Sequence, residues 1–503
     1  MPAAALFHGI GLFEELRRRW RALDRDARVA LVGITLLTAG AVAVRVWFMA
    51  SYRPAFLGFN DSYQYVLSAA RDIFSAPQWP AGYPFFLRLV HHLSDRLSFT
   101  ILVQHALGVV SGLLLYKAVR RLRVPAWLGL LPAAVVFFGG TGLFLEHSLL
   151  ADPVLNFTVA LAMYCAVRSL EGEQLRWALL TGAAIGIGFW VKTIAISGAA
   201  VIPAVLLFGV AADRWRRLLF SSATLLAAVA LVVFYFGAHA YFTGRWGYER
   251  QSSWNLYGRV ATFVDCGAFT PPRGTAFLCP REPLSARQPP AYYQYAPGSP
   301  AVQRYGAPNR APDSANAVLR RFAISAMLHE PLAYAGAILR GLTFYVSPRW
   351  GEDYTPASIR EALEESKEQS AIEPAIALLY PHSVGYYRRP GAVRALSWYE
   401  SHTRVQGALL IVLLLAAVAG PFLLRGRTRW AAILFGLTAL ASATFAVAGA
   451  GYDARYAYVA FGPLAASSAL GAWALWSDAR VRRAAQRSRL SPRMLNRNEE
   501  KKI

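Results

Sequence analysis

Residues 58–84, GFNDSYQYVLSAARDIFSAPQWPAGYP, follow the first long apolar run of the chain, Val29–Ala50. An acidic residue, Asp61, stands near the start of this stretch, and apolar side chains then recur from Tyr63 to Phe74 at helical spacing. Polar side chains occupy the opposite face of that helix. The pattern predicts a helix that lies in the membrane surface rather than across the bilayer, with a carboxylate beside it.

The composition of the whole chain indicates an integral membrane protein. Of its 503 residues, 55% are hydrophobic and 16% are charged, whereas soluble domains carry about 25% charged residues. Much of the net charge of +23 falls in short segments between apolar runs. This follows the positive-inside rule and not the pattern of a nucleic-acid-binding face, so we expect no nucleic-acid partner. The basic segments are Arg17–Arg28, Lys117–Arg123, Arg214–Arg217, Arg425–Arg429 and Arg480–Lys502.

The predicted fold is an all-α polytopic membrane protein with about ten transmembrane helices, because each crossing needs about 20 apolar residues. If the N-terminus is cytoplasmic, every basic segment falls on the cytoplasmic side. We therefore expect a protein of the cytoplasmic (inner) membrane with both termini inside. The apolar runs are Val29–Ala50, Ser98–Tyr116, Ala126–Leu145, Leu149–Arg168, Trp177–Val191, Ile194–Ala211, Leu218–Ala240, Val405–Leu424, Trp430–Gly449 and Val459–Trp476.

A long outer insertion separates the last three predicted helices from the others. It is rich in Pro, Gly and Tyr, and its aromatic content favours an ordered exoplasmic domain over a disordered linker. Within it, Pro331–Val346 is predicted to be another interfacial helix. The predicted regions are a basic cytoplasmic N-terminus (1–28), a transmembrane core (29–240) with its first outer loop (51–97), the insertion (241–404), the last helices (405–477) and a basic cytoplasmic tail (478–503).

Two of the three cysteines lie in the insertion, on the side of the membrane where disulfides persist. The spacing of Cys266 and Cys279 permits a bridge without requiring one, and we predict that they pair. Cys165 lies within an apolar run and is expected to be unreactive.

Acidic residues in two predicted outer turns are candidates for chemistry. Asp61 could accept a proton from a hydroxyl as a general base, or cap the helix that follows, and the two roles are compatible. The next outer turn, LFLEHSLLADPVLNF, carries Glu146, His147 and Asp152. Asp152 precedes Pro153, which is typical of a helix N-cap. Glu146 and His147 could bind a divalent metal or position a sugar hydroxyl.

Two cationic residues are candidates for binding a phosphate. Lys192 is the only one of the five lysines inside an apolar region, where ionisable side chains are costly. Arg455, in the predicted outer turn GYDARYAYVAFGPLA, has the planar donor-rich group that suits phosphate. The simpler alternatives are that Lys192 extends its amine to the membrane surface and that Arg455 belongs to an interfacial aromatic belt. Trp79 and Tyr83 could stack on a sugar or belong to the same belt.

Several common catalytic motifs are absent from the sequence. It contains no Walker-type phosphate loop, no GxGxxG opening a helix, no GxSxG and no HExxH. Any reaction would therefore draw on an activated substrate or a gradient, and no cofactor is required. A divalent metal is compatible with the sequence, but no strong ligand spacing supports one.

The order and topological side of several short motifs resemble the C-type glycosyltransferases, most closely their bacterial branch of mannosyl-, aminoarabinose- and arabinofuranosyltransferases. These membrane enzymes take sugars from polyprenyl-phosphate donors. The resemblance covers roughly Val29–Ala211 and Val405–Trp476. The motifs that carry it are FNDSYQYVLSA, WPAGYPFFLRL, EHSLLADPVLNF, WVKTIAIS and DARYAYVAFGPLA.

The resemblance implies a role for each candidate residue. Asp61 matches the proposed base, either Glu146 or Asp152 matches the second-loop acid, and Lys192 and Arg455 match the donor-phosphate ligands. The expected partners are a polyprenyl-phosphate sugar, membrane lipid, and a cell-wall glycan, lipid or protein acceptor. The expected reaction is transfer of a monosaccharide to an acceptor hydroxyl on the outer face. The alternatives are a transporter or lipid-sugar flippase, and a non-catalytic assembly partner.

Overall fold

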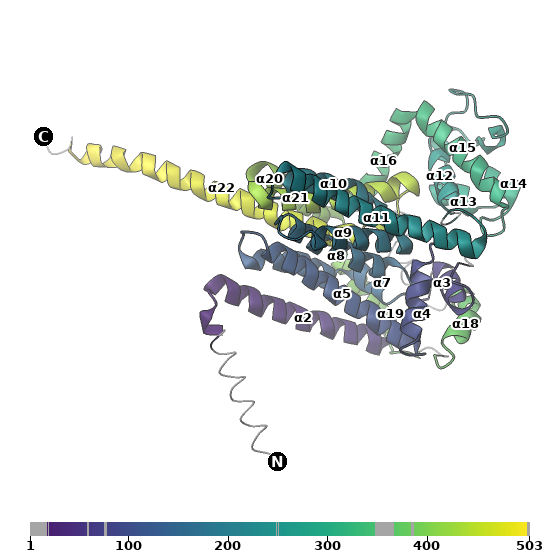
Figure 1. The fold of residues 1–503 in the computed structure, drawn as a ribbon, viewed down its shortest axis with the longest axis horizontal. Coiled ribbons are helices and arrows are strands. Elements are labelled where there is room, and N and C mark those ends of the chain that lie inside the picture. The colour runs from purple at the N-terminus through teal and green to yellow at the C-terminus, as the bar shows by residue number, and fades with distance from the viewer. Residues whose placement is uncertain are drawn as a thin grey trace, which may run out of the picture.

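The protein is a bundle of long helices with further helices gathered at one end (Figure 1). The computed structural model describes residues 18, 20–57, 60–74, 78–247, 249, 251–347, 367–383 and 387–499, and only the backbone of 60, 367–371 and 484–499. The bundle helices are α2 (Arg25–Ser51), α5 (Leu97–Arg120), α6 (Leu130–Phe138), α7 (Gly140–Glu146), α8 (Asp152–Ser169), α9 (Arg176–Val191), α10 (Ile196–Gly209), α11 (Arg214–Thr243), α20 (Gly407–Leu423), α21 (Gly426–Gly449) and α22 (Tyr458–Glu499).

The other elements lie mainly at what we call the loop-rich end of the bundle, and α22 extends away from the opposite end (Figure 1). Two short strands, β1 and β2, pair antiparallel and join the end of α2 to the segment before α19. The elements are β1 (Tyr52–Arg53), α3 (Asn60–Ala70), α4 (Gly82–His91), α12 (Gln251–Ala261), α13 (Pro290–Tyr295), α14 (Pro300–Tyr305), α15 (Asp313–His329), α16 (Pro331–Val346), α18 (Lys367–Leu379), β2 (Tyr387–Arg388) and α19 (Ala392–Thr403). Short 3-10 turns are η1 (Ala126–Gly129), η2 (Thr193–Ala195), η3 (Ala276–Leu278), η4 (Leu284–Ala286) and η5 (Ala454–Ala457).

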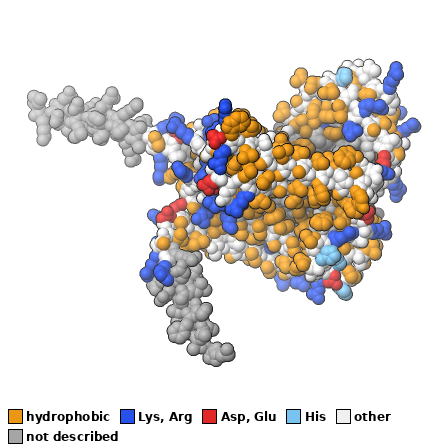
Figure 2. Space-filling model, viewed as in Figure 1, with side chains coloured by type: hydrophobic (Ala, Val, Ile, Leu, Met, Phe, Trp, Pro, Cys, Tyr) orange, Lys and Arg blue, Asp and Glu red, His pale blue; other side chains and the backbone are white. Residues whose placement is uncertain are grey.

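Turns that carry basic segments meet at the end of the bundle opposite the loop-rich end. The carboxylate of Asp26 accepts a hydrogen bond from the backbone N–H of Ala126, and Arg427 donates to the backbone carbonyl of Arg121. On the face shown in Figure 2, hydrophobic side chains cover the middle of the bundle, and Lys and Arg gather towards its ends. This is the distribution of a protein that crosses a membrane several times.

The predicted count of ten transmembrane helices is not confirmed. In the part of the chain that the structure describes, six helices are long and apolar enough to span a membrane, or up to eight if each of two bent pairs forms one span. One bent pair joins η1 and α6 to α7 at 53°, and the other joins α15 to α16 at 100°. Each predicted run does contain a helix, but α9 and α10 are short because the chain is extended at Lys192 between them. A multi-pass helical membrane protein is thus confirmed.

Polar side chains and a glycine define the ends of two long helices. Asp24 precedes α2 and accepts a hydrogen bond from the backbone N–H of Ala27. Asp213 precedes α11 and accepts from two backbone N–H groups of its first turn. These contacts satisfy donors that a helix leaves unpaired at its start. Gly244 ends α11 with φ of 69°, a conformation that glycine adopts without steric cost.

Helices α9 and α11 approach each other closely through two glycines four residues apart. A Cβ atom on Gly182 would lie 2.2 Å from the carbonyl oxygen of Thr224, and one on Gly186 would lie 2.6 Å from the Cβ of Leu231. Small residues at this spacing let helix backbones pack in direct contact within a membrane. The packing fixes α9, and with it Lys192 at its end.

The insertion has a hydrophobic core of its own. Trp254, Tyr257, Tyr293 and Phe322 are fully buried in a cluster built from α12, α13, α14 and α15. A disulfide joins Cys266 to Cys279 beside this cluster. The insertion is therefore an ordered helical unit over its described residues, whereas residues 348–366 of the predicted region lie outside them.

Candidate functional site

Five charged residues meet at the loop-rich end, and we call them the charge cluster: Asp61, Asp152, Lys192, Asp453 and Arg455. The guanidinium of Arg455 donates from Nη1 to Asp61 at 2.9 Å and from Nε to Asp453 at 2.8 Å. The amine of Lys192 donates to Oδ1 of Asp152 at 2.7 Å. The cluster thus joins residues from the first outer loop, two bundle helices and the last outer turn.

Each member of the cluster stands at the end of a helix. Asp61 lies in the first turn of α3, and Asp152 is the first residue of α8. Lys192 directly follows α9. Asp453 precedes η5 and accepts a hydrogen bond from the backbone N–H of Arg455, which orients the arginine. Because these helices end at the same end of the bundle, their terminal side chains can meet there.

The predicted N-cap role of Asp152 is wrong. The residue that precedes α8 is Ala151, and no side-chain cap hydrogen bond forms there. Asp152 turns to Lys192 instead, because a carboxylate that is only 2% exposed is stabilised far more by a cation than by an amide. Its second oxygen, Oδ2, is buried and has no hydrogen-bond partner in the described part of the chain.

Two tyrosines connect the halves of the charge cluster. The ring of Tyr456 lies 5.3 Å from the amine of Lys192 and 5.5 Å from the guanidinium of Arg455. Tyr65 of α3 is fully buried, and its hydroxyl has no hydrogen-bond partner among the residues that the structure describes. Burial, followed by the charges of Asp61 and Asp152, raises the pKa of Tyr65 well above its usual value. Tyr65 therefore keeps its proton and can donate it to a bound ligand.

The two predicted sugar-stacking residues lie behind Tyr65. Tyr83 is fully buried, contacts the ring of Tyr65 edge-on, and donates its hydroxyl to Gln104. Trp79 is half-buried and also contacts the ring of Tyr65 edge-on. Tyr83 thus supports the wall of the site, and of the pair only Trp79 retains exposed surface.

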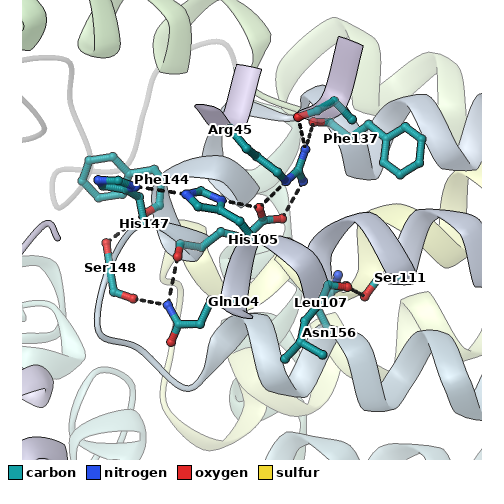
Figure 3. Close-up of polar contacts among 12 residues, drawn as sticks. Arg45, Gln104, His105, Leu107, Ser111, Phe137, Phe144, His147, Ser148 and Asn156 are labelled. Carbon is teal, nitrogen blue, oxygen red and sulfur yellow. Dashed lines mark hydrogen bonds and ion pairs between the residues drawn. The ribbon is translucent and has the colours of Figure 1, made fainter. Parts of the chain in front are cut away.

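Glu146 and His147 lie away from the charge cluster, in what we call the buried array: Arg45, His105, Glu146 and His147 (Figure 3). Glu146 is 0% exposed, and both of its carboxylate oxygens accept from Arg45 at 2.9 Å. His105 lies 3.0 Å from Oε2 of Glu146 on one side and 3.0 Å from His147 on the other. His147 reaches the backbone carbonyl of Tyr52 at 2.9 Å.

The surroundings of the array are closely packed. A Cβ atom on Gly108 would lie 1.9 Å from Oε1 of Glu146, so only glycine leaves room for the carboxylate. Burial is the main reason that the pKa of His147 falls to about 3, so this imidazole is neutral. Because a cation already occupies both oxygens of Glu146, this carboxylate is poorly placed to hold a metal. In the described residues, no group of three or more His, Cys, Asp or Glu side chains could hold a metal ion.

The structure brings together four residues predicted from the sequence, Asp61, Asp152, Lys192 and Arg455, and separates Glu146 and His147 from them. Sequence reasoning missed Asp453, Tyr65, His105 and Arg45. A signal was present for Arg45, since a charged residue inside an apolar run is a functional candidate. Asp453 stands two residues before Arg455, a spacing that an Asx-type turn uses. No sequence pattern distinguishes Tyr65 from the other tyrosines.

Three solved membrane-protein structures are similar to the chain at low identity. The Pmt1–Pmt2 protein O-mannosyltransferase complex of S. cerevisiae shares 14% identity over 50% of this chain and 37% of the other, with a TM-score of 0.35. The oligosaccharyltransferase AglB of Archaeoglobus fulgidus shares 12% sequence identity over 92% of this chain and 52% of its own, with a TM-score of 0.45. ArnT of Cupriavidus metallidurans, in a structure bound to undecaprenyl phosphate, shares 14% sequence identity over 87% of this chain and 77% of its own, with a TM-score of 0.35. The chain thus spans about half the length of the archaeal protein.

A family model agrees with the resemblance drawn from the sequence. No curated protein matches the chain significantly. Residues 78–242 match the model of the dolichyl-phosphate-mannose-protein mannosyltransferases, and this segment contains Asp152, Lys192 and most of the buried array. Asp61 and Arg455 lie outside it. Over this third of the chain, the resemblance to the C-type, polyprenyl-phosphate-sugar-dependent membrane glycosyltransferases is therefore confirmed.

Proposed function

We propose that the protein transfers a monosaccharide from a polyprenyl-phosphate donor to an acceptor hydroxyl of the cell envelope. The observation that carries the proposal is the contact between Asp61 and Arg455, which lie 394 residues apart in sequence and pair directly beside Lys192 and Asp152. A potential base and two potential phosphate ligands thus converge at the end of the bundle to which a membrane-bound donor has access.

The cations of the cluster suit the phosphate of such a donor. Arg455 and Lys192 are 14% and 17% exposed, so each is accessible yet partly desolvated. Partial desolvation strengthens a charge-assisted hydrogen bond to phosphate. Within the described ranges, the hydroxyl of Tyr65 and Oδ2 of Asp152 are buried without hydrogen-bond partners, and they offer one donor and one acceptor to sugar hydroxyls.

The proposed reaction is one displacement at the anomeric carbon. The donor phosphate competes with Asp61 for the guanidinium of Arg455, which leaves the carboxylate to accept a proton. Asp61 takes the proton of the acceptor hydroxyl, and that oxygen forms a bond to the anomeric carbon. The bond between this carbon and the phosphate oxygen breaks, and Arg455 and Lys192 stabilise the charge on the departing polyprenyl phosphate. The donor is already activated, so no nucleotide or other cofactor is required.

We also propose the orientation of the protein in the membrane that the basic segments of the sequence predict. In a bacterial inner membrane with both termini on the cytoplasmic side, the loop-rich end faces outward. Cell-wall glycans, lipids and proteins offer acceptor hydroxyls there. The basic segments at the opposite end support this orientation.

Transfer in proteoliposomes tests the proposal. Purified protein is reconstituted with a panel of polyprenyl-phosphate mannose, aminoarabinose and arabinofuranose donors, and labelled product is measured for the wild type and Asp61→Asn. Wild-type transfer that collapses in a folded Asp61→Asn variant supports the enzyme and its base together. Equal transfer by both proteins moves the base to another residue. Movement of a sugar-lipid across the bilayer without a new glycosidic bond supports a flippase instead.

A further inference from the structure

The buried array contains a row of three hydrogen bonds, and Figure 3 shows the one between His105 and His147. The first joins Oε2 of Glu146 to Nδ1 of His105, the second joins Nε2 of His105 to Nδ1 of His147, and the third joins Nε2 of His147 to the carbonyl oxygen of Tyr52. All three bonds lie in the protein interior, where Glu146, His105 and His147 are at most 2% exposed.

The row has more hydrogen bonds than its neutral histidines have protons to supply. A backbone carbonyl and an ionised carboxylate only accept hydrogen bonds, and a neutral imidazole carries one N–H. Two neutral histidines therefore supply two protons for three bonds. If Glu146 were ionised and both histidines neutral, two lone pairs would face each other at about 3.0 Å in one of the bonds.

The position of the missing proton follows from the end of the row. Since the carbonyl of Tyr52 can only accept, Nε2 of His147 carries that residue's proton, and its Nδ1 accepts from Nε2 of His105. The remaining proton then lies between Nδ1 of His105 and Oε2 of Glu146. It makes either an imidazolium beside a carboxylate or a neutral imidazole beside a carboxylic acid.

The array also ties together the two segments that carry Asp61 and Asp152. The carbonyl of His147 accepts from the backbone N–H of Phe56, and the hydroxyl of Ser62 donates to the carbonyl of Leu149. Gln104, next to His105, donates to the carbonyls of Glu146 and Ser148. A shift of His147 would therefore move the turn that leads to Asp152 relative to the loop that holds Asp61.

We propose that His105 and Glu146 share one proton beyond those of an ionised carboxylate and two neutral imidazoles, and that this proton holds the two acid-bearing segments in register. Glu146, His105 and His147 are then positioning residues. Loss of the proton leaves a repulsive contact in the row and loosens the turn. Among the described residues, the other charged or titratable groups that face the row are Arg45 of α2, Tyr52 of β1, Tyr458 of α22 and Tyr399 of α19.

A spectroscopic experiment on the full-length wild type tests the proton itself without any substrate. Nitrogen-15 histidine spectra and carboxyl-region infrared spectra are recorded near neutral pH. We expect either one imidazolium signal that disappears in His105→Asn, or one carboxylic-acid band that disappears in Glu146→Gln. The proposal is overturned if His105 and His147 are both neutral and no carboxylic-acid band is lost in Glu146→Gln.

A pair of variants tests the positioning role, and this arm rests on the proposed function. In Glu146→Gln, the amide N–H replaces the shared proton in the row, but the same NH2 group takes the place of the oxygen that accepts from Nε of Arg45. Because the row stays closed while one contact to Arg45 is lost, we expect a kcat between those of the wild type and Glu146→Leu. We also expect kcat to fall at alkaline pH in the wild type, as the shared proton is lost, and not in Glu146→Gln. Glu146→Leu breaks the row, and a displacement of the reacting groups predicts a kcat lower by about 10²-fold with little change in the donor KM.

The two experiments fail separately. A Glu146→Gln protein that melts near the wild-type temperature but is as inactive as Asp61→Asn would make Glu146 a catalytic residue and overturn the positioning role. If no transfer is found for the wild type, the proposed function fails, whereas the spectra still decide whether the shared proton exists.

Discussion

The charge cluster and the buried array contain the same kinds of charged side chain but differ in their surroundings. Each pairs carboxylates with cations over 2.7–2.9 Å. In the array, Arg45 and Glu146 are 4% and 0% exposed, whereas Arg455 and Asp61 are 14% and 18% exposed. Ion-pair distance therefore does not distinguish a site that meets a substrate from one that holds the protein together. Exposure does.

The two regions also differ in how completely their polar atoms are paired. The described residues leave Oδ2 of Asp152 and the hydroxyl of Tyr65 buried without partners beside the charge cluster. In the array, Glu146, His105 and His147 use every side-chain oxygen and ring nitrogen. Since buried polar atoms are normally paired, the unpaired atoms point to the charge cluster as the place where a ligand completes the set.

The largest expected effect is the loss of the proposed base. Asp61→Asn keeps the shape of the side chain and removes its ability to take a proton, so we expect kcat to fall by about 10²–10⁴-fold. The matched control is Asp453→Asn, which removes the other carboxylate that contacts Arg455. Labelled-product assays of both variants at saturating donor and acceptor measure the difference.

The comparison between Asp61 and Asp453 has a clear contrary outcome. If both variants lose activity equally, the carboxylates act only by orienting Arg455, and neither is a base. A shared loss would also show that the guanidinium, rather than Asp61, sets the chemistry of the charge cluster.

The next effect concerns the phosphate. Arg455→Lys keeps the charge but loses the planar fork that contacts Asp61 and Asp453 together. A charge-assisted hydrogen bond contributes about 1.5–3 kcal/mol, so the donor KM should rise about 10–100-fold. Arg245→Lys serves as the control because Arg245 is 58% exposed in a pair with Asp313. An unchanged donor KM in Arg455→Lys would remove Arg455 from the phosphate site.

Much of the charge cluster could be predicted from the sequence because its members break a local pattern. Lys192 interrupts an apolar region, and Asp61 stands at the start of a segment with helical spacing of apolar residues. Their mutual contacts could not be predicted, since Asp61 and Arg455 lie at opposite ends of the chain. The alternating direction of the helices brings those ends together, and that follows from the membrane topology only once every crossing is known.

The buried array could not be assigned from sequence for a different reason. Glu146 and His147 are adjacent, and the sequence places them in one predicted turn, but His105 from α5 lies between their functional groups. Glu146 ends α7, which is bent by 53° from the preceding helix, and the bend carries the carboxylate into the interior. The Gly139–Gly140 pair marks a break in the residue order, but neither the direction of the bend nor the space beside Gly108 has such a signature.

The smallest expected effect on transfer comes from crowding the array. In Gly108→Ala, the added methyl group meets a carboxylate that Arg45 and His105 hold in place, and overpacking of this kind costs about 1–3 kcal/mol. Gly237→Ala is the control, because a Cβ atom there has no neighbour within 4 Å. We expect a lower melting temperature in detergent for Gly108→Ala alone, with less loss of transfer than in Asp61→Asn. Equal melting temperatures would mean that Glu146 can move aside, and the rigid array would no longer explain how the acid-bearing segments are held.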